Sequence, residues 1–247
     1  MRRIGVLLSK GGVGKTTTAV NLAHALALDG ARVLLVDCDS QGQCAAALGL
    51  TPAHGLADLV DGMPLPEACT PTERDGLTLL AGGRALAGLQ RDISRRDFGS
   101  ERVLAEALAG VDGYDYLVLD TSPAWDALTV NALFSAEEVL APVALEPLAM
   151  RALGAFLAQL GDVRRYHAGV RLRWICPTFA DGRVAKSAEL LGQLGEAYGA
   201  LLTEPIRYSV RLSECAAFGR TIFEHDPGGR GAADYAQLAR RVTTDAT

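Results

Sequence analysis

The chain has 247 residues, 49% of them hydrophobic and 21% charged, and a formal net charge of −5. This composition is typical of a globular protein and excludes a disordered or fibrous chain, and no apolar run reaches the roughly 18 residues of a membrane span. The five cysteines form no Cys-x-x-Cys pair, so we expect reduced thiols in a cytoplasmic protein and disfavour zinc and iron–sulfur centres.

Short runs of β-branched residues and leucine recur along the chain, most of them apolar throughout, as in strands buried on both faces of a parallel sheet. They cover 4–8, 33–36, 77–80, 116–119, 139–145, 172–176 and 201–206. Helical spacing fills the intervals, first over 19–26 with a stop at Asp29-Gly30, then over 84–91, 98–109, 128–134, 148–160, 184–198 and 230–242. This alternation predicts an α/β fold, a single-domain open, mostly parallel twisted sheet with helices on both faces. No linker interrupts it, so we expect one domain over 1–247.

A glycine-rich stretch, 9–18, follows the first predicted strand and opens the first predicted helix. Glycines let backbone N–H groups surround phosphate oxygens, and a helix N-terminus adds a favourable potential for anions. Lys15 is therefore expected to reach the terminal phosphates of a nucleotide, and the Thr16 hydroxyl to coordinate Mg²⁺. The alternative, a turn that binds nothing, is disfavoured because Gly14-Lys15-Thr16 lies at the strand-to-helix junction.

Two later strands end in carboxylates. The second predicted strand is followed by Asp37 and Asp39, and the strand 116–119 by Asp120. Ligands and catalytic groups lie at the carboxyl ends of strands in open α/β sheets, and an apolar strand that ends in Asp is the arrangement in which a carboxylate holds Mg²⁺. For Asp37 and Asp39 the alternative is capping of the next helix.

The glycine-rich stretch departs from the usual phosphate loop, because Ser9 replaces its first glycine and Lys10 adds a second lysine. The chain has only three lysines against 21 arginines, and Lys10 and Lys15 are two of the three. The resulting Lys10-Gly11-Gly12-Val13-Gly14-Lys15-Thr16 is a deviant Walker A motif that resembles that of the ParA/MinD family of dimeric ATPases. The resemblance implies that Lys10 crosses a nucleotide-sandwich interface and acts like an arginine finger in trans. A solvated lysine beside the loop is the alternative.

The resemblance also assigns roles to the acids. Asp37-Cys38-Asp39-Ser40-Gln41-Gly42 looks like switch I of the family, with Ser40 in place of its usual proline, and implies that Asp39 orients or deprotonates the attacking water while Asp37 supports the metal shell. Asp120-Thr121-Ser122-Pro123 looks like Walker B and switch II. The implied catalytic residues are Lys10, Lys15 and Asp39, and the metal-binding residues are Thr16, Asp37, Asp39 and Asp120. The implied ATP-binding residues are Lys10, Gly11, Gly12, Val13, Gly14, Lys15, Thr16, Thr17 and Thr178.

Similarity extends over nearly the whole chain and is greatest to chromosomal ParA (Soj-type) partitioning proteins. The stretches that carry it include 128–133, 141–149, 181–183, 210–215 and 218–220. The sequence Arg211-Leu212-Ser213-Glu214 is specific to this branch. Just before it, Arg207-Tyr208-Ser209 stands where relatives have Pro-Arg-Asn near the adenine, which leaves Thr178 as the remaining part of the base pocket and puts strict preference for ATP in question.

Two arginines are candidates for DNA contacts, because those of Soj-type relatives that correspond to Arg183 and Arg211 contribute to nonspecific DNA binding. Arginines along one face contact phosphates without reading bases. The charge distribution permits this, since 1–161 carry 12 basic and 19 acidic groups whereas 162–247 carry 12 and 10. The alternative for both arginines is a solvated surface.

The resemblance implies an ATPase that hydrolyses ATP to ADP and phosphate and partitions DNA. ATP with Mg²⁺ would close a homodimer that binds nonspecific double-stranded DNA, and a ParB-like partner would stimulate slow hydrolysis and release during chromosome or plasmid segregation, in the cytoplasm and on the nucleoid. One alternative is the same ATPase with a protein complex as cargo. A MinD-like membrane ATPase is disfavoured because the tail 239–247 offers few apolar anchors, and an iron–sulfur ATPase because its cysteine spacing is missing.

Overall fold

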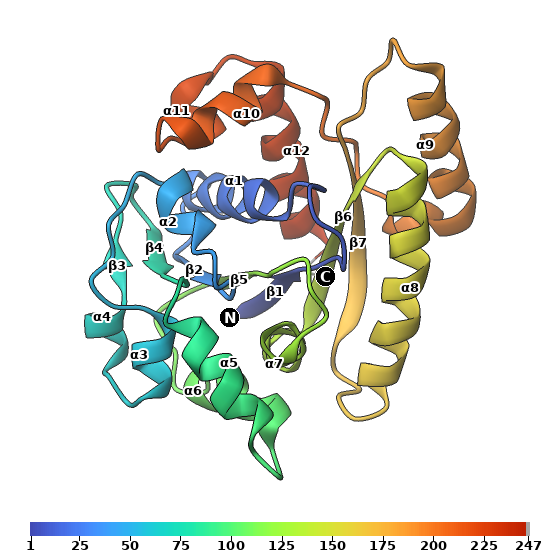
Figure 1. The fold of residues 1–247 in the computed structure, drawn as a ribbon. Helices are drawn as coiled ribbons and strands as arrows, with labels where there is room; N and C mark the ends of the chain where they lie inside the picture. The colour runs from blue at the N-terminus through green and yellow to red at the C-terminus, as the bar shows by residue number, and fades with distance from the viewer. Residues whose placement is uncertain (246–247) are drawn as a thin grey trace.

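The computed structural model describes residues 1–245, in which seven strands form one sheet in the order β3-β4-β2-β5-β1-β6-β7 (Figure 1). The strands are β1 (Arg2–Val6), β2 (Val33–Asp37), β3 (Thr70–Pro71), β4 (Leu77–Leu80), β5 (Tyr116–Asp120), β6 (Glu138–Ala144) and β7 (Arg171–Thr178). Every neighbouring pair is parallel except β3 with β4 at one edge. The fold class predicted from the sequence is confirmed, while a single domain over 1–247 stays a prediction.

Helices cover both faces of this sheet (Figure 1). They are α1 (Lys15–Leu28), α2 (Gln43–Ala47), α3 (Leu56–Val60), α4 (Leu65–Ala68), α5 (Leu86–Ser94), α6 (Val103–Ala107), α7 (Ala127–Ser135), α8 (Pro147–Arg164), α9 (Ala185–Tyr198), α10 (Val210–Ala217), α11 (Ile222–His225) and α12 (Arg230–Thr244), with 3₁₀ turns at Ser100–Arg102 and Gly199–Leu201. In Figure 1, α1 and α10–α12 lie on one side of the sheet, α3–α7 lie on the other, and α8 and α9 flank β6 and β7.

The central strand β2 shows why the sequence forms this layered structure. All five of its residues are buried, and side chains alternate between the two faces of a strand. Val33 and Leu35 belong to the core beneath α1 and α12, whereas Leu34 and Val36 belong to the core beneath α5–α7. A strand that must pack on both sides is therefore apolar at every position.

The predicted strand 201–206 is wrong. This segment begins in the 3₁₀ turn Gly199–Leu201 and makes only isolated bridges, from Ile175 to Leu202 and from Ala180 to Arg207. Its N–H groups do reach β7, since Thr203 donates to the Ile175 carbonyl and Ile206 to the Pro177 carbonyl. Proline has no N–H, so neither Pro177 of β7 nor Pro205 of the segment can donate the bond that a regular ladder needs at this edge.

The other predicted strands and the long helices are confirmed with shifts at their ends, except that 98–109 divides into a 3₁₀ turn and α6. Within 1–245, no helix has the length and apolar character needed to cross a membrane. The apolar side of α12 faces the core through Tyr235, Leu238 and Val242, all buried. The last two residues of the tail considered as a membrane anchor, 246 and 247, lie outside the described residues.

Candidate active site

The loop after β1 folds back on the N-terminus of α1. Gly12 and Gly14 have φ angles of +75° and +87°, in the left-handed region that residues with a side chain disfavour. Gly14 is the N-cap of α1, so the first N–H groups of the helix, which lack partners within it, lie at this loop. The sequence thus forms a concave backbone surface suited to an anion.

The ammonium groups of the two loop lysines have different partners. Lys15 is buried, and its Nζ donates to the Lys10 carbonyl at 2.8 Å. Burial lowers the pKa of Lys15, although the charges of Asp120 and Asp39 act in the opposite direction. Lys10 instead forms an ion pair with Glu146, the N-cap residue of α8, whose side chain is 48% exposed. Of the two, Lys15 lines the cavity at the loop and Lys10 does not.

The predicted carboxylates meet at adjacent strand ends. Asp37 and Asp120 are paired residues of β2 and β5, and both are buried. Asp37 accepts hydrogen bonds from the Asp39 N–H at 2.9 Å and the Cys44 N–H at 3.0 Å, and the Cys44 thiol donates to Asp120 Oδ2 at 3.3 Å. Among the described residues, Asp120 Oδ1 is buried without a hydrogen-bond partner.

Ionisation of these acids is unfavourable in the buried site, and a bound cation would favour their charged forms. Burial raises the pKa of Asp37 to about 6 and that of Asp120 to about 7, and the charge of Asp39 adds to the first shift as that of Asp37 adds to the second. Hard oxygen donors suit Mg²⁺, and the Thr16 hydroxyl is near enough to Asp120 to oppose the rise in its pKa. The donor set and the unpartnered Asp120 oxygen therefore fit a divalent cation bound beside Thr16.

The phosphate loop and Asp39 line one cavity of about 390 Å³. Its other walls are Thr17, Gln41, Gln43, Thr121, Pro123 and Phe179. Asp39 is buried at 7% exposure and accepts a hydrogen bond from the Gln41 N–H at Oδ1, 2.9 Å away. Asp37 and Asp120 lie behind this wall, and neither lines the cavity.

A smaller pocket of about 120 Å³ adjoins Gly14 and Thr17. Thr178 lines it, as the sequence predicts for a base pocket, and its hydroxyl donates to the Val13 carbonyl at 2.9 Å. Arg207 also lines it, but its guanidinium is held by Asp234. Ser209, Ser213 and Tyr235 line the same pocket.

Phe179 lines both cavities, and sequence reasoning missed it. Within 1–245 it is the one residue other than glycine with a positive φ, +55°. A Cβ on Gly14 would lie 3.9 Å from its ring. A strained phenylalanine after a strand has no sequence signature, because glycine and asparagine are the residues that usually signal this conformation.

The two candidate DNA-binding arginines lie outside both cavities. The side chain of Arg183 is 84% exposed and forms two hydrogen bonds with Asp181, at 2.9 and 2.7 Å. Arg211 is the second residue of α10, with a side chain 62% exposed and a 3.0 Å bond to Glu214. Both are therefore accessible, each beside a carboxylate of its own segment.

Comparison with known proteins finds relatives that cover nearly the whole chain. A family model described as an AAA domain (AAA_31) matches residues 1–171. The chromosome-partitioning ATPase Soj of Thermus thermophilus is 40% identical over 98% of this chain and 95% of its own length, and the chromosome partitioning protein ParA of Caulobacter vibrioides is 32% identical over 98% and 94%.

Solved structures show the same likeness. Cobyrinic acid a,c-diamide synthase from Mycobacterium smegmatis, crystallised with a bound ATP analog and magnesium, is 32% identical with a TM-score of 0.84 and covers 98% of this chain and 94% of its own. The cell division ATPase MinD of Pyrococcus furiosus has a TM-score of 0.81 over 99% of both chains, but at 24% identity it shows the fold alone.

Proposed function

This chain belongs to the ParA/Soj family of P-loop ATPases, and we propose that it partitions DNA through an ATP-dependent homodimer. ATP binding closes a sandwich dimer that binds double-stranded DNA nonspecifically, and a ParB-like partner stimulates slow hydrolysis that releases it. The observation that carries the proposal is the pair of lysines on one phosphate loop, Lys15 buried against the loop and Lys10 paired outside it with Glu146. The names of the relatives support chromosome segregation, and hence a cytoplasmic protein associated with the nucleoid.

The phosphate loop would hold the nucleotide, with Lys15 against its terminal phosphates. Burial disfavours the charged ammonium, and phosphate oxygens offset that cost because they bring negative charge into the same cavity. Thr16, Asp37, Asp39 and Asp120 would hold Mg²⁺, which supplies positive charge at the phosphate oxygens when bound. Thr178 and the pocket beside Thr17 would receive the base.

Hydrolysis needs a water in line with the terminal phosphorus and an acceptor for its proton. In the part of the chain that the structure describes, only the Gln41 N–H donates to the Asp39 carboxylate, at Oδ1, so Oδ2 is left to accept from a water in the cavity. Asp39 would orient that water as its oxygen bonds to phosphorus and the bond to ADP breaks.

Lys10 would act on the nucleotide of the partner protomer. Its ion pair with Glu146 is partly exposed, and such pairs contribute little to stability, so the ammonium can leave it at small cost. Across a dimer interface it would neutralise charge that develops on the transferred phosphoryl group.

Arg183 and Arg211 would contact DNA phosphates. Each is exposed and paired with a neighbouring carboxylate, so a phosphate can take the place of Asp181 or Glu214 at little cost. One protomer offers a weak patch, and a dimer would raise avidity by presenting two on one duplex.

A gel shift on arbitrary duplex DNA tests the proposal. We expect retardation with Mg²⁺ and ATP and at least about tenfold weaker binding with ADP, since allosteric coupling commonly changes affinity by roughly 5- to 150-fold. Random-sequence competitor DNA should displace the probe as well as unlabelled probe does. Equal binding with both nucleotides, or no binding with either, would contradict the nucleotide switch.

A further inference from the structure

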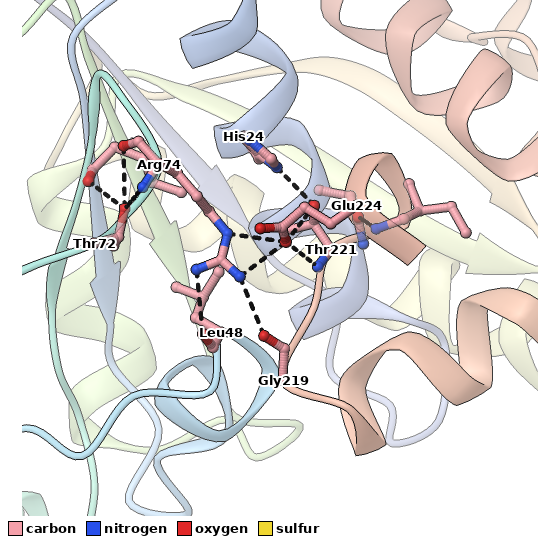
Figure 2. A network of polar contacts seen from close by, with 10 residues as sticks. His24, Leu48, Thr72, Arg74, Gly219, Thr221 and Glu224 are labelled. Carbon is pink, nitrogen blue, oxygen red and sulfur yellow. Dashed lines mark hydrogen bonds and ion pairs between the residues drawn. The ribbon is translucent and has the colours of Figure 1, made fainter. Parts of the chain in front are cut away.

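A polar network centred on Arg74 lies outside both cavities (Figure 2). Arg74 is in the loop between β3 and β4, and only 8% of its side chain is exposed. Its guanidinium donates to the carbonyls of Leu48 and Gly219, both at 3.1 Å. It also donates to Glu224 Oε2, from Nε at 3.0 Å and from Nη2 at 2.8 Å. One planar group thus contacts three separate segments of the chain.

The two carbonyls lie at the ends of two helices. Leu48 is the C-cap of α2, and Gly219 follows the C-cap of α10. The segments touch there, since a Cβ on Gly219 would lie 2.5 Å from the Gly49 Cα. Carbonyls at a helix C-terminus lack partners within the helix, and a cation there satisfies them. Arg74 therefore fixes the end of α2 to the end of α10.

The other end of α2 reaches the metal-binding carboxylates. Cys44, in the first turn of this helix, donates its N–H to Asp37 at 3.0 Å and its thiol to Asp120 at 3.3 Å. Because α2 has only five residues, the Leu48 N–H bonds directly to the Cys44 carbonyl at 3.1 Å. One helical turn therefore connects the carboxylates to the carbonyl that Arg74 holds.

Glu224 connects Arg74 to Thr221 and, through Thr221, to α1. Its Oε2 accepts hydrogen bonds from the N–H of Thr221 at 2.7 Å and from the Thr221 hydroxyl at 3.1 Å, and His24 of α1 lies 2.6 Å from that hydroxyl (Figure 2). Burial alone would raise the pKa of Glu224, but the hydrogen bonds from Arg74 and Thr221 leave it lowered, so the carboxylate stays charged. Asn21 of α1 also accepts from the Ile222 N–H at 2.8 Å.

We propose that Arg74 is a positioning residue that couples the nucleotide site to the candidate DNA-binding helix, because it joins the ends of α2 and α10 against the fixed Glu224. α10 carries Arg211 and packs directly on α2. Nucleotide and cation at Asp37 and Asp120 shift α2, and Arg74 passes that shift to α10. This inference rests on the proposed function, since its output is nucleotide-dependent DNA binding.

Arg74→Met tests the coupling, with Arg32→Met as a matched control that removes an exposed arginine paired with Asp115. In the wild type, DNA affinity with ATP should exceed that with ADP by about tenfold or more. In Arg74→Met we expect the two affinities to differ by no more than about twofold. Nucleotide affinity and DNA-free ATP hydrolysis should stay within about twofold of the wild type, because Arg74 lines neither the phosphate-loop cavity nor the pocket beside Thr17. The ratio of the two DNA affinities should be unchanged in Arg32→Met. A folded Arg74→Met that keeps the wild-type ratio would overturn the proposal.

Arg74→Met leaves the Glu224 carboxylate without its cation, which could unfold the protein. The double variant Arg74→Met/Glu224→Gln removes both charges, and it takes the place of the single variant in the test if the single variant unfolds. Thermal unfolding and circular dichroism establish folding. If neither variant folds, Arg74→Lys replaces them; it keeps the charge but cannot hold two carbonyls and a carboxylate in one plane, so the ratio should fall partway.

Amide hydrogen exchange separates failure of this inference from failure of the proposed function. Mg²⁺ with a nonhydrolysable ATP analogue should change exchange over 210–217 in the wild type and leave it unchanged in Arg74→Met, with no DNA present. If nucleotide changes exchange in α10 of the wild type but not of Arg74→Met, and the wild type binds no DNA, then the coupling stands and the DNA-binding proposal fails. If exchange in α10 of the wild type does not respond to nucleotide, the coupling itself is wrong.

Discussion

At the scale of single residues, the contacts of Lys10 and Lys15 separate binding from catalysis. Lys15→Ala removes the buried cation of the phosphate loop and should weaken ATP binding by roughly 10- to 100-fold, the usual effect of losing a charged hydrogen bond. Lys10→Ala should bind ATP within about threefold of the wild type but lose hydrolysis by on the order of 10³, as expected for a charge supplied in trans. Nucleotide titration calorimetry and phosphate release measure the two effects.

Lys186→Ala is the matched control for both variants. It removes the third lysine of the chain, which is 51% exposed and pairs with Glu189 on α9, away from either cavity. Its binding and turnover should equal those of the wild type. Normal hydrolysis by Lys10→Ala at protein concentrations that support dimers would show that the assignment in trans is wrong.

The buried pair Asp37 and Asp120 predicts an unusual pH dependence. Burial raises their pKa values from the ordinary carboxyl value of 3.8 to about 6 and about 7, so unfolding releases protons between about pH 4 and 7. Without Mg²⁺, this pair therefore makes the protein less stable as pH rises through that window. Carboxylates with lowered pKa values, such as Asp181 at about 2, titrate below it.

Thermal unfolding from pH 4 to 8 checks this sign. The decline in melting temperature across the window should be smaller in Asp120→Asn, which removes one of the two acids that ionise there. Mg²⁺ with ADP should reverse the trend in the wild type, because a cation binds the ionised carboxylates and so binds more tightly as pH rises. A metal-free wild type that gains stability between pH 6 and 8, by an amount equal in Asp120→Asn, would contradict the argument.

At the scale of elements, the sequence predicts those whose residues face an apolar layer over many positions. β2 is buried throughout and α1 ends at the Asp29 C-cap with Gly30 at a φ of +90°, both as their residues predict. The segment 201–206 begins with two leucines but continues with Thr203, Glu204 and Pro205, and the missing N–H groups of Pro205 and of Pro177 on the neighbouring strand prevent a regular ladder. Pro205 is visible in the segment itself, whereas Pro177 lies more than 20 positions away, where a local pattern does not include it.

Short helices fixed by tertiary contacts are the elements that the residue pattern left unassigned. α2 and α11 have five and four residues, too few for a helical period to show. α2 is held by Asp37 at one end and Arg74 at the other, and α11 by Asn21 and a capping box. In the candidate site, the loop and the three acids follow from motif and strand-end position, whereas Phe179 and the partner of Lys10 depend on packing between segments.

At the scale of the whole molecule, a net charge of −5 restricts DNA binding to a local patch whose strength depends on salt. Arg183→Ala/Arg211→Ala should weaken ATP-dependent DNA binding and make the slope of log affinity against log salt shallower by about 2 per protomer engaged, since each lost phosphate contact removes roughly 0.9. Fluorescence anisotropy on a random duplex from 50 to 200 mM salt measures it. Arg32→Ala/Arg95→Ala removes two exposed, carboxylate-paired arginines from other surfaces and should leave the slope unchanged. ATP-dependent dimerisation, measured by light scattering, should be intact in both double variants. An equal loss of DNA affinity in both would mean that the net charge of the protein, and not this patch, sets the affinity.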